Sequence, residues 1–438
     1  MSVTIAETSV SGVVVRCHAW LETMRGPQGY GGPVVHWWRN CLQFCGPALD
    51  WRYEGIIAGY LTLFERTGDT SWLASARRAG DDLVRGQLPT GNYRDSCFEL
   101  NPGPAGTPHE AAADVGLLLL ARTLRTRGDA DWQQYLAAAE RNLRGFYLAR
   151  LWRQDEQRFS DNQQMSCFVP NKAGTLLEAL VLLDELTDCA EDLRRYVRPT
   201  ADAILAHQLP ATGSTLDGAI AQISYGRTIQ AKYFPYYQAR CARGLLAAHA
   251  LLGDDRYLDG AVRAMRFALR WRDADGAFPQ VVYGNGCANR YPRWIAAVGE
   301  VLHVLDLLRP HGLDADPEPT RRWLLAGQLP SGGFRSADGF AAQVSQRPAA
   351  GPPDARDLLP VVGWTDKAFR YLTTQTLPGG GSDAPHWGEA LPCRHRGEPV
   401  ELVEDVRAIE LRHEGRVAYR WRKGDRWATF GPSRGTTA

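Results

Sequence analysis

The chain has 438 residues, of which 44% are hydrophobic and 23% charged, and its formal net charge is +1 at pH 7. This composition is ordinary for a globular protein, and a nearly neutral chain gives no electrostatic reason to expect a nucleic acid or a membrane surface as partner. The N-terminal segment has neither a basic nor an apolar leader, and no apolar run is long enough to span a membrane. We therefore expect a cytoplasmic protein without membrane insertion.

Helical hairpins follow one another along the chain. A first helix is predicted at 13–25, followed by a Gly- and Trp-rich connection with a short helix near 35–44. Five pairs then follow: 52–66 with 71–86, 109–127 with 131–151, 171–186 with 191–207, 233–252 with 256–271, and 291–308 with 317–327. A last helix is predicted at 365–376. Pairing it with the first helix gives six hairpins.

The two helices of each pair differ in character. The first is more uniformly apolar, as in GLLLLA or GTLLEALVLL, whereas the second carries a charged face. A helix that is apolar all round must be buried, and one with a single apolar stripe lies outside it. The sequence therefore predicts an all-α fold in which inner helices form a ring inside a ring of outer helices. The long connections from outer to inner helices would lie together on one side.

A short pattern recurs where the outer helices end, and WLLAGQLPSGGF at 323–334 is its clearest copy. The polar residue at its centre recurs about every 60 residues, which is the length of two helices with their connections. Its positions are Arg25, Gln87, Arg153, Gln208, Arg272 and Gln328, and an aromatic residue follows six positions later at Tyr93, Phe159, Phe278 and Phe334. We interpret this pattern as a structural element that ends an outer helix.

After about residue 378 the pattern changes to alternating strands, which predicts a small antiparallel β appendage. We expect two domains, a helical one at 1–377 and the appendage at 378–438. The nine cysteines show no disulfide framework, so reduced thiols are expected. Cys41 and Cys45 lie four residues apart, but no CxxC or HxxxH pattern accompanies them. We expect no metal site and no cofactor.

The six-hairpin pattern over about residues 13–376 resembles the (α/α)6 toroid superfamilies. These include six-hairpin glycosidases, uronate-acting lyases and epimerases, N-acylglucosamine 2-epimerase relatives, terpenoid cyclases and protein prenyltransferases. The element Gln328–Phe334 is similar to the QW repeat of the terpenoid cyclases. Their DxDD acid motif is absent here, since the nearest strings, Asp273-Ala-Asp275-Gly276 and Asp314-Ala-Asp316-Pro317, do not complete it. The zinc-binding set of the prenyltransferases is not identifiable either.

The resemblance implies a pocket where the inner helices begin, beneath the long loops. Glu54 and Asp366 begin the first and last inner helices, and two carboxylates across a cleft are the minimum set for glycoside hydrolysis. For a lyase or an epimerase, Tyr233, Tyr236 or His109 could remove the proton next to a carboxylate while a cation steadies the enolate.

Cations and aromatic residues gather at the same predicted rim. They would bind an anionic sugar through bidentate contacts and ring stacking. The candidate substrate-binding residues are Trp37, Trp38, Arg39, Arg52, Tyr53, Arg94, Lys172, Arg227, Lys232, Tyr291, Arg293, Trp364 and Lys367.

The sequence thus favours a carbohydrate-active enzyme that acts on a uronate-like sugar by hydrolysis, elimination or epimerisation. A terpenoid cyclase or prenyltransferase with an aromatic-lined cavity is the alternative enzyme class. A binding scaffold without catalysis is the third hypothesis.

Overall fold

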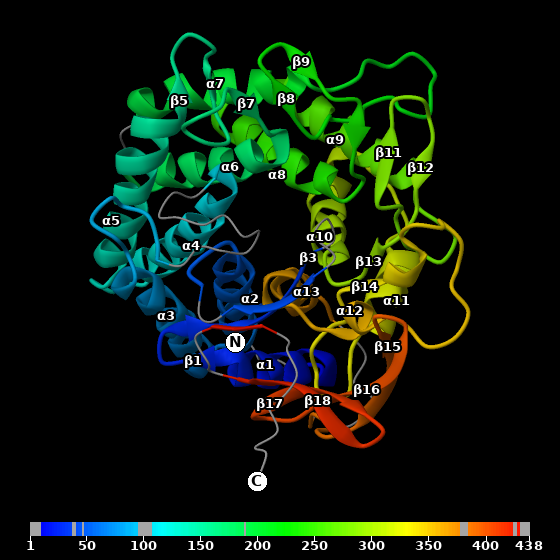
Figure 1. Ribbon diagram of the computed structural model, residues 1–438. Helices are drawn as coiled ribbons and strands as arrows, with labels where there is room; N and C mark the ends of the chain where they lie inside the picture. Colours follow the sequence, from blue (N-terminus) through cyan, green and yellow to red (C-terminus); the bar gives the residue numbers. More distant parts are fainter. Residues whose placement is uncertain are drawn as a thin grey trace, which may run out of the picture.

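The helices form two concentric rings, seen end-on in Figure 1. The computed structural model describes residues 10–36, 41–45, 48–94, 107–187, 190–376, 384–423 and 427–429. The inner helices are α2 (Arg52–Thr67), α4 (Ala112–Thr126), α6 (Pro170–Thr187), α8 (Tyr237–Leu252), α10 (Val298–Leu308) and α13 (Val362–Thr374). The outer helices are α1 (Gly12–Met24), α3 (Thr70–Arg85), α5 (Trp132–Asn142), α7 (Ala190–Ala206), α9 (Asp255–Arg270) and α11 (Glu318–Ala326).

Each inner helix packs against the next, and α13 packs against α2, which closes the ring. The outer helix α1 packs against α13, so the first and last helices of the chain complete one hairpin. The closing contact is tight because a Cβ added at Gly55 of α2 would lie 2.3 Å from the Asp366 carbonyl oxygen. The predicted all-α (α/α)6 toroid is therefore confirmed.

Local sequence explains the short turns between inner and outer helices. Gly68 and Gly253 end α2 and α8 in the left-handed conformation, with φ of 71° and 66°, which glycine adopts without a steric penalty. Asp69 and Asp254 then cap α3 and α9 by accepting hydrogen bonds from Ser71 N and Arg256 N. These turns make each hairpin antiparallel.

Three expected helical stretches are wrong. Residues 233–236 precede α8, and residues 291–297 precede α10. Pro235 explains the late start of α8, because proline offers no N–H and disfavours helix in the residue before it. Helix α10 starts late because Arg293 and Trp294 pair as a strand with Asp338 and Ala337. The region expected as a helix near 35–44 contains β3 (Gly32–His36) paired with β4 (Cys41–Cys45).

Short strands tie the long connections together at the mouth where the inner helices begin. They are β1 (Arg25–Gly26) and β2 (Gly29–Tyr30), β5 (Trp152–Arg153) and β6 (Arg158–Phe159), β7 (Cys167–Phe168), β8 (Ser224–Tyr225) and β9 (Thr228–Ile229), β10 (Lys232–Tyr233), β11 (Val281–Tyr283) and β12 (Ala288–Asn289), and β13 (Arg293–Trp294) with β14 (Ala337–Asp338). A 3-10 turn, Pro108–Ala111, leads into α4, a π-helical stretch, Leu143–Leu151, extends α5, and the short α12 (Ala355–Leu358) precedes α13.

The glutamines among the recurring polar residues fasten neighbouring outer helices to each other. The Gln87 side-chain amide donates to Gly91 O and to Ala138 O of α5, at 2.8 and 2.7 Å. Gln208 bonds Gly218 O and Gly260 O of α9 in the same way, and Gln328 bonds Gly332 O and Val13 O of α1. The following aromatics Tyr93, Phe159, Phe278 and Phe334 are all buried. The repeat is structural, as its pattern indicated.

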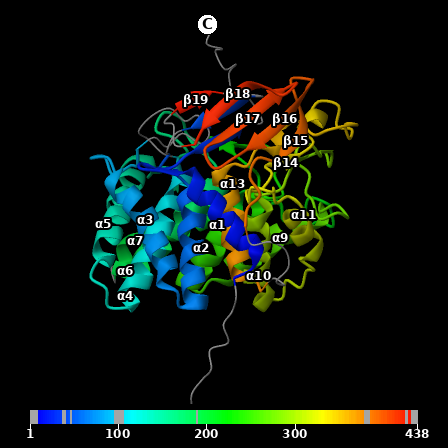
Figure 2. The same cartoon turned by 90° about the horizontal axis from the view of Figure 1, so that it is seen from below.

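A four-stranded antiparallel sheet follows the ring: β15 (Ala390–His395), β16 (Glu398–Glu404), β17 (Ala408–His413) and β18 (Arg416–Arg422). Figure 2 shows it at one end of the helical ring, beside α1. The buried Glu404 carboxylate joins the two parts, because it accepts from Trp20 Nε1 at 2.9 Å and pairs with Lys423 Nζ at 2.8 Å. A last strand, β19 (Trp427–Thr429), pairs with β4. Among the described residues no helix has the length and apolar character needed to cross a membrane.

Candidate active site

A cavity of about 190 Å³ opens at the mouth where the inner helices begin. We call it the first cavity. Its wall consists of Trp51, His109, Asp161, Val169, Asn171, Lys172, Gln222, Ile223, Tyr236, Tyr237, Arg240, Ala297, Glu300, Trp364 and Lys367. All six hairpins contribute through loop ends or the first turns of their inner helices, and Lys367 lies furthest along its helix. Aromatic, cationic, acidic and imidazole groups thus face one enclosed space.

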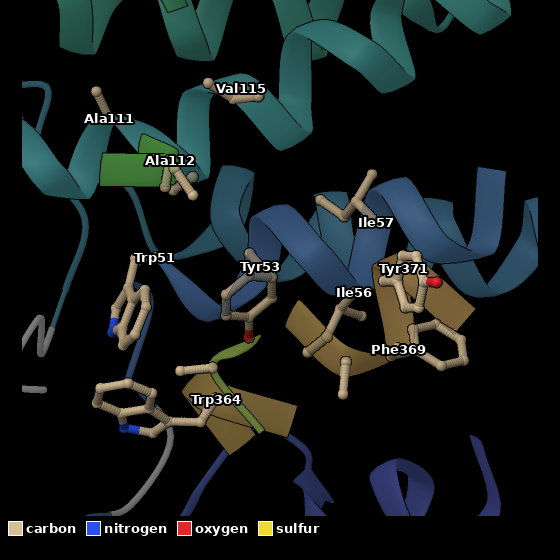
Figure 3. Packing of buried hydrophobic residues seen from close by; sticks show 14 of the residues in the cluster. Trp51, Tyr53, Ile56, Ile57, Ala111, Ala112, Val115, Trp364, Phe369 and Tyr371 are labelled. Atoms are coloured by element: carbon tan, nitrogen blue, oxygen red, sulfur yellow. The ribbon is translucent and has the colours of Figure 1, made fainter. Parts of the chain in front are cut away.

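Tryptophans build one side of the first cavity. The Trp294 and Trp364 rings are stacked, with centroids 4.3 Å apart and 5° between planes, and Trp51 meets Trp364 edge-on at 5.8 Å. Figure 3 shows Trp51 and Trp364 next to each other, at the same end of α2 and α13. The Lys367 ammonium lies 4.7 Å from the Trp51 ring centroid. Flat aromatic faces beside a cation suit the apolar face of a sugar ring that also carries negative charge.

His109 lies in the 3-10 turn before α4, with its ring 4.8 Å from that of Trp51. Burial holds the pKa of His109 well below its ordinary value, and the nearby charges of Arg240, Lys367 and Lys172 lower it further. The imidazole is therefore neutral near pH 7. Its buried Nδ1 has no hydrogen-bond partner among the residues that the structure describes. A neutral, unpartnered imidazole in a cavity can accept a proton from a ligand.

Two carboxylates reach the first cavity, and a cation holds each of them. Asp161 lies 3.1 Å from Lys172 Nζ, and Glu300 lies 2.8 Å from Arg240 Nη2. Their side chains keep 16% and 14% of their surface exposed, so both can still meet a ligand. Each cation has a donor to share between its carboxylate and a bound anion.

Behind the first cavity lies a buried group of charges that we call the ion cluster. It comprises four acids, Glu54, Glu178, Glu300 and Asp366, and four cations, Arg240, Arg243, Lys367 and Arg370. Glu54 lies at its centre, 2.8 Å from both Arg240 and Arg243, 3.4 Å from Lys367, and paired with Arg370. Burial alone would raise the pKa of Glu54, but these four cations hold it well below its ordinary value.

Glu54 and Asp366 do not line the first cavity. Both are fully buried, and Asp366 Oδ2 accepts from Gly55 N and from Lys367 Nζ, at 3.1 and 2.7 Å. A carboxylate locked as an anion by four cations cannot serve as a general acid. Because neither Glu54 nor Asp366 lines the first cavity, the function proposed below does not use the predicted catalytic pair.

Asp366→Asn should change how stability depends on pH. Burial raises the pKa of Asp366 to about 7 from an ordinary value of 3.8, against the opposing effect of Lys367. The folded protein therefore binds a proton more tightly than the unfolded chain, and its stability falls as the pH rises from about 4 to about 7. Asparagine at this position cannot ionise. In urea unfolding, the free energy of unfolding of the variant relative to wild type should therefore increase by ~2–4 kcal/mol between pH 4 and 7 and stay constant at higher pH.

The matched control for this pH experiment is Asp155→Asn, at an exposed aspartate. Its free energy of unfolding should follow the wild-type curve at every pH. If the Asp366→Asn curve also runs parallel to wild type between pH 4 and 7, Asp366 does not carry this pH dependence.

The structure places five of the residues predicted for the site in the first cavity: His109, Lys172, Tyr236, Trp364 and Lys367. Trp37, Trp38 and Arg39 lie outside the described residues. The other predicted residues do not line it, and they are Arg52, Tyr53, Arg94, Arg227, Lys232, Tyr233, Tyr291 and Arg293.

Most of these residues outside the first cavity have structural contacts instead. Arg52 pairs with Asp50 at 2.8 Å, and Tyr53 accepts from Tyr30 N. Arg293 pairs with Asp338 and Asp275, at 2.7 and 2.6 Å. Tyr233 packs in a small separate apolar cluster with Phe267, and Arg227 is exposed.

Sequence analysis missed Arg240 and Glu300. Each is a charged residue within an otherwise apolar inner helix, in the strings ARCARGLLAAHALL and IAAVGEVLHVL. A charge in a helix that must be buried needs a partner, because an isolated buried charge is strongly unfavourable. That signal could have identified both positions, although not their pairing.

No family model matches the chain, and no curated protein matches it. Solved structures do match. The chain is similar to cellobiose 2-epimerase from Bacillus thermoamylovorans B4167, with 12% identity and a TM-score of 0.61 over 81% of this chain and 94% of that one.

Two further structures are similar to the same extent. A D-mannose isomerase has 12% identity and a TM-score of 0.60 over 86% of this chain and 100% of that one. An unsaturated glucuronyl hydrolase specific for heparin has 14% identity and a TM-score of 0.58 over 83% and 93%. At these identities the likeness is one of fold, and the chain is accordingly an (α/α)6 toroid of six helical hairpins, like these three enzymes.

Proposed function

We propose that this protein is an enzyme that moves a proton on an anionic sugar, as an epimerase or isomerase, in the first cavity. The observation that carries the proposal is the neutral, half-buried His109, which lines one cavity with Lys172, Arg240 and Lys367. A proton acceptor beside several cations is the arrangement that enolate chemistry needs.

The reaction uses these groups as follows. His109 takes the proton from the carbon next to a carbonyl or carboxylate, and the C–H electron pair becomes the C=C bond of an enolate. The carbonyl oxygen then carries the negative charge, which the cations stabilise. For an isomer, the proton returns to the neighbouring carbon while the hydroxyl proton of the first carbon passes to the former carbonyl oxygen. For an epimer, a second proton donor of the cavity wall, for which Asp161 and Glu300 are the candidates, protonates the opposite face of the same carbon. Atoms and charge balance without any further reactant.

The cavity also favours a small, charged substrate. Its volume of about 190 Å³ lies below the ~300–1,000 Å³ usual for drug-sized ligands, which suits a single sugar ring. The aromatic side can stack on that ring, and Lys172 and Arg240 can share their donors with a carboxylate or phosphate. This mixture of acids and cations favours a sugar over the uncharged hydrocarbon chain of a terpenoid.

The structures of similar fold support the same reading. They include an enzyme named as a sugar epimerase and one named as a sugar isomerase. Hydrolysis is the second candidate, because Asp161 and Glu300 both reach the first cavity and could act as acid and base. A glucuronyl hydrolase among the similar structures agrees with that alternative.

Isotope incorporation separates the two functions. The purified protein would be incubated with panels of aldoses, uronates, sugar phosphates and unsaturated uronyl disaccharides, in D₂O and in H₂¹⁸O. The proposal predicts uncleaved isomers of the substrate that carry deuterium on the carbon next to the carbonyl. Cleaved products with ¹⁸O at the anomeric carbon, and no deuterium on carbon, would establish hydrolysis instead.

A further inference from the structure

A second cavity opens at the opposite mouth of the ring, where the inner helices end. Its volume is about 580 Å³. We call it the second cavity, and its wall consists of Leu119, Arg122, Glu178, Val181, Leu182, Arg243, Leu246, Ala247, His249, Ala250, His303, Leu307, His311 and Arg370. No residue of this wall belongs to the first cavity.

Along the inner helices α8 and α13, the residues that face the two cavities lie one helical turn apart. On α8, Arg240 faces the first cavity and Arg243 the second; on α13, Lys367 faces the first and Arg370 the second. Residues three apart lie on the same side of a helix, one turn further along. The ion cluster therefore separates the cavities and presents charged side chains to each.

The wall of the second cavity carries more cations than acids among its described residues. Arg122, Arg243 and Arg370 stand against the single carboxylate of Glu178. The Arg370 guanidinium is 12% exposed, and its pKa is lowered by burial and then by the positive charge of Arg243. The buried Glu54 carboxylate contacts both arginines from the side of the ion cluster, and an anion in the second cavity would add a carboxylate contact from the open side.

Inner-helix ends expose carbonyl oxygens at this mouth, which would oppose an anion. Arginines outside the cavity already occupy several of them. Arg125 donates to Leu186 O at 2.9 Å, and Arg66 donates to Gln375 O at 3.0 Å and also to Thr373 O. The partial negative charge at the ends of α6 and α13 is thereby offset.

His303 supplies a further polar group that the protein itself does not use. Burial holds the pKa of His303 well below its ordinary value, and Arg370 and Arg243 lower it further, so the ring is neutral. It makes no hydrogen bond within the described part of the chain. Its ring N–H can thus donate to a ligand oxygen.

The rest of the wall is apolar apart from the imidazoles of His249 and His311. Its larger apolar side chains are Leu119, Val181, Leu182, Leu246 and Leu307, and Leu307 is 42% exposed. We propose that the second cavity binds a small organic carboxylate with an apolar body, whose carboxylate meets Arg243, Arg370 and His303 and whose hydrocarbon part lies against these leucines and the valine.

Calorimetric titration of the full-length protein tests this site. The probe is hexanoate, compared with hexanol, hexylamine and inorganic phosphate. We expect one hexanoate per chain, hexanol at least tenfold weaker because it lacks the charge-assisted hydrogen bonds, and no binding of hexylamine. Equal affinities for hexanoate and hexanol, or binding of phosphate without hexanoate, would overturn the assigned ligand class.

Substitutions locate the bound hexanoate. Leu307→Glu and Arg122→Gln change exposed rim positions, so folding should survive, and each should weaken hexanoate several-fold through charge. Arg370→Gln should weaken it about tenfold or more. The control Arg322→Gln, at a 71% exposed arginine of α11, should leave the affinity unchanged.

Lys172→Gln distinguishes the two cavities, since Lys172 lines the first one alone. The hexanoate affinity should not change in this variant. Loss of binding with Lys172→Gln, together with no effect of Leu307→Glu and Arg122→Gln, would place hexanoate in the first cavity and refute the second site. These experiments measure only the affinity for hexanoate. A result that refutes the second binding site therefore does not affect the proposed sugar chemistry.

Discussion

His109→Asn should lower kcat on the sugar substrate by ~10²–10⁴-fold, the usual contribution of a positioned general base. Asparagine keeps a polar side chain of similar reach but cannot accept the substrate proton. KM should change much less, because Trp364, Lys172 and Arg240 still bind the sugar. Steady-state kinetics and the rate of deuterium incorporation measured on the same substrate should fall together.

The pH profile gives an independent readout of His109. Because burial and the neighbouring cations hold its pKa well below the ordinary value, kcat should stay level when the pH drops from 7 to 6, where an ordinary histidine base would lose activity. The control His413→Asn, at an exposed histidine of β17, should match wild type. A kcat for His109→Asn within about twofold of wild type would remove His109 from the mechanism.

Glu54→Gln should destabilise the protein by ~3–5 kcal/mol, as expected when one partner is removed from a buried ion pair. Arg240, Arg243, Lys367 and Arg370 all point at this carboxylate, and the variant leaves their charges partly uncompensated. Urea unfolding monitored by tryptophan fluorescence provides the measurement. The exposed Glu65 lies on the same helix, so Glu65→Gln is the matched control and should change little.

The pH dependence of this stability difference follows from the same contacts. The pKa of Glu54 is lowered by its cationic neighbours, so its contribution is complete above the ordinary value of 4.5 and declines as the pH falls below it. Because Glu54 also raises the pKa of Asp366, the comparison is made in the Asp366→Asn background. There the difference caused by Glu54→Gln should be constant from pH 5 to 8 and shrink in more acidic solution. A stable Glu54→Gln protein with a large loss of kcat would instead support the catalytic role predicted from sequence.

The position of a residue along its inner helix indicated whether it lies near the first cavity. The beginnings of these helices supply His109, Lys172, Tyr236 and Trp364 to one cavity, because closing the ring brings every such segment to the same mouth. The direction in which a side chain points from its helix could not be predicted from the sequence in this way. Glu54 begins its helix like the others, yet it turns inward to the ion cluster and away from the first cavity.

The sequence by itself determined the six hairpins, their inner and outer members and the structural role of the Gln repeat, since helical periodicity, capping residues and glycine turns act over a few residues. Only the tertiary structure decided which charges meet. Arg240 finds Glu54 from 186 positions away, and Lys367 finds it from 313 positions away. Such pairings depend on ring closure and on the side-chain directions of packed helices, which local sequence does not specify, and they separate a reactive cavity from a buried ion cluster.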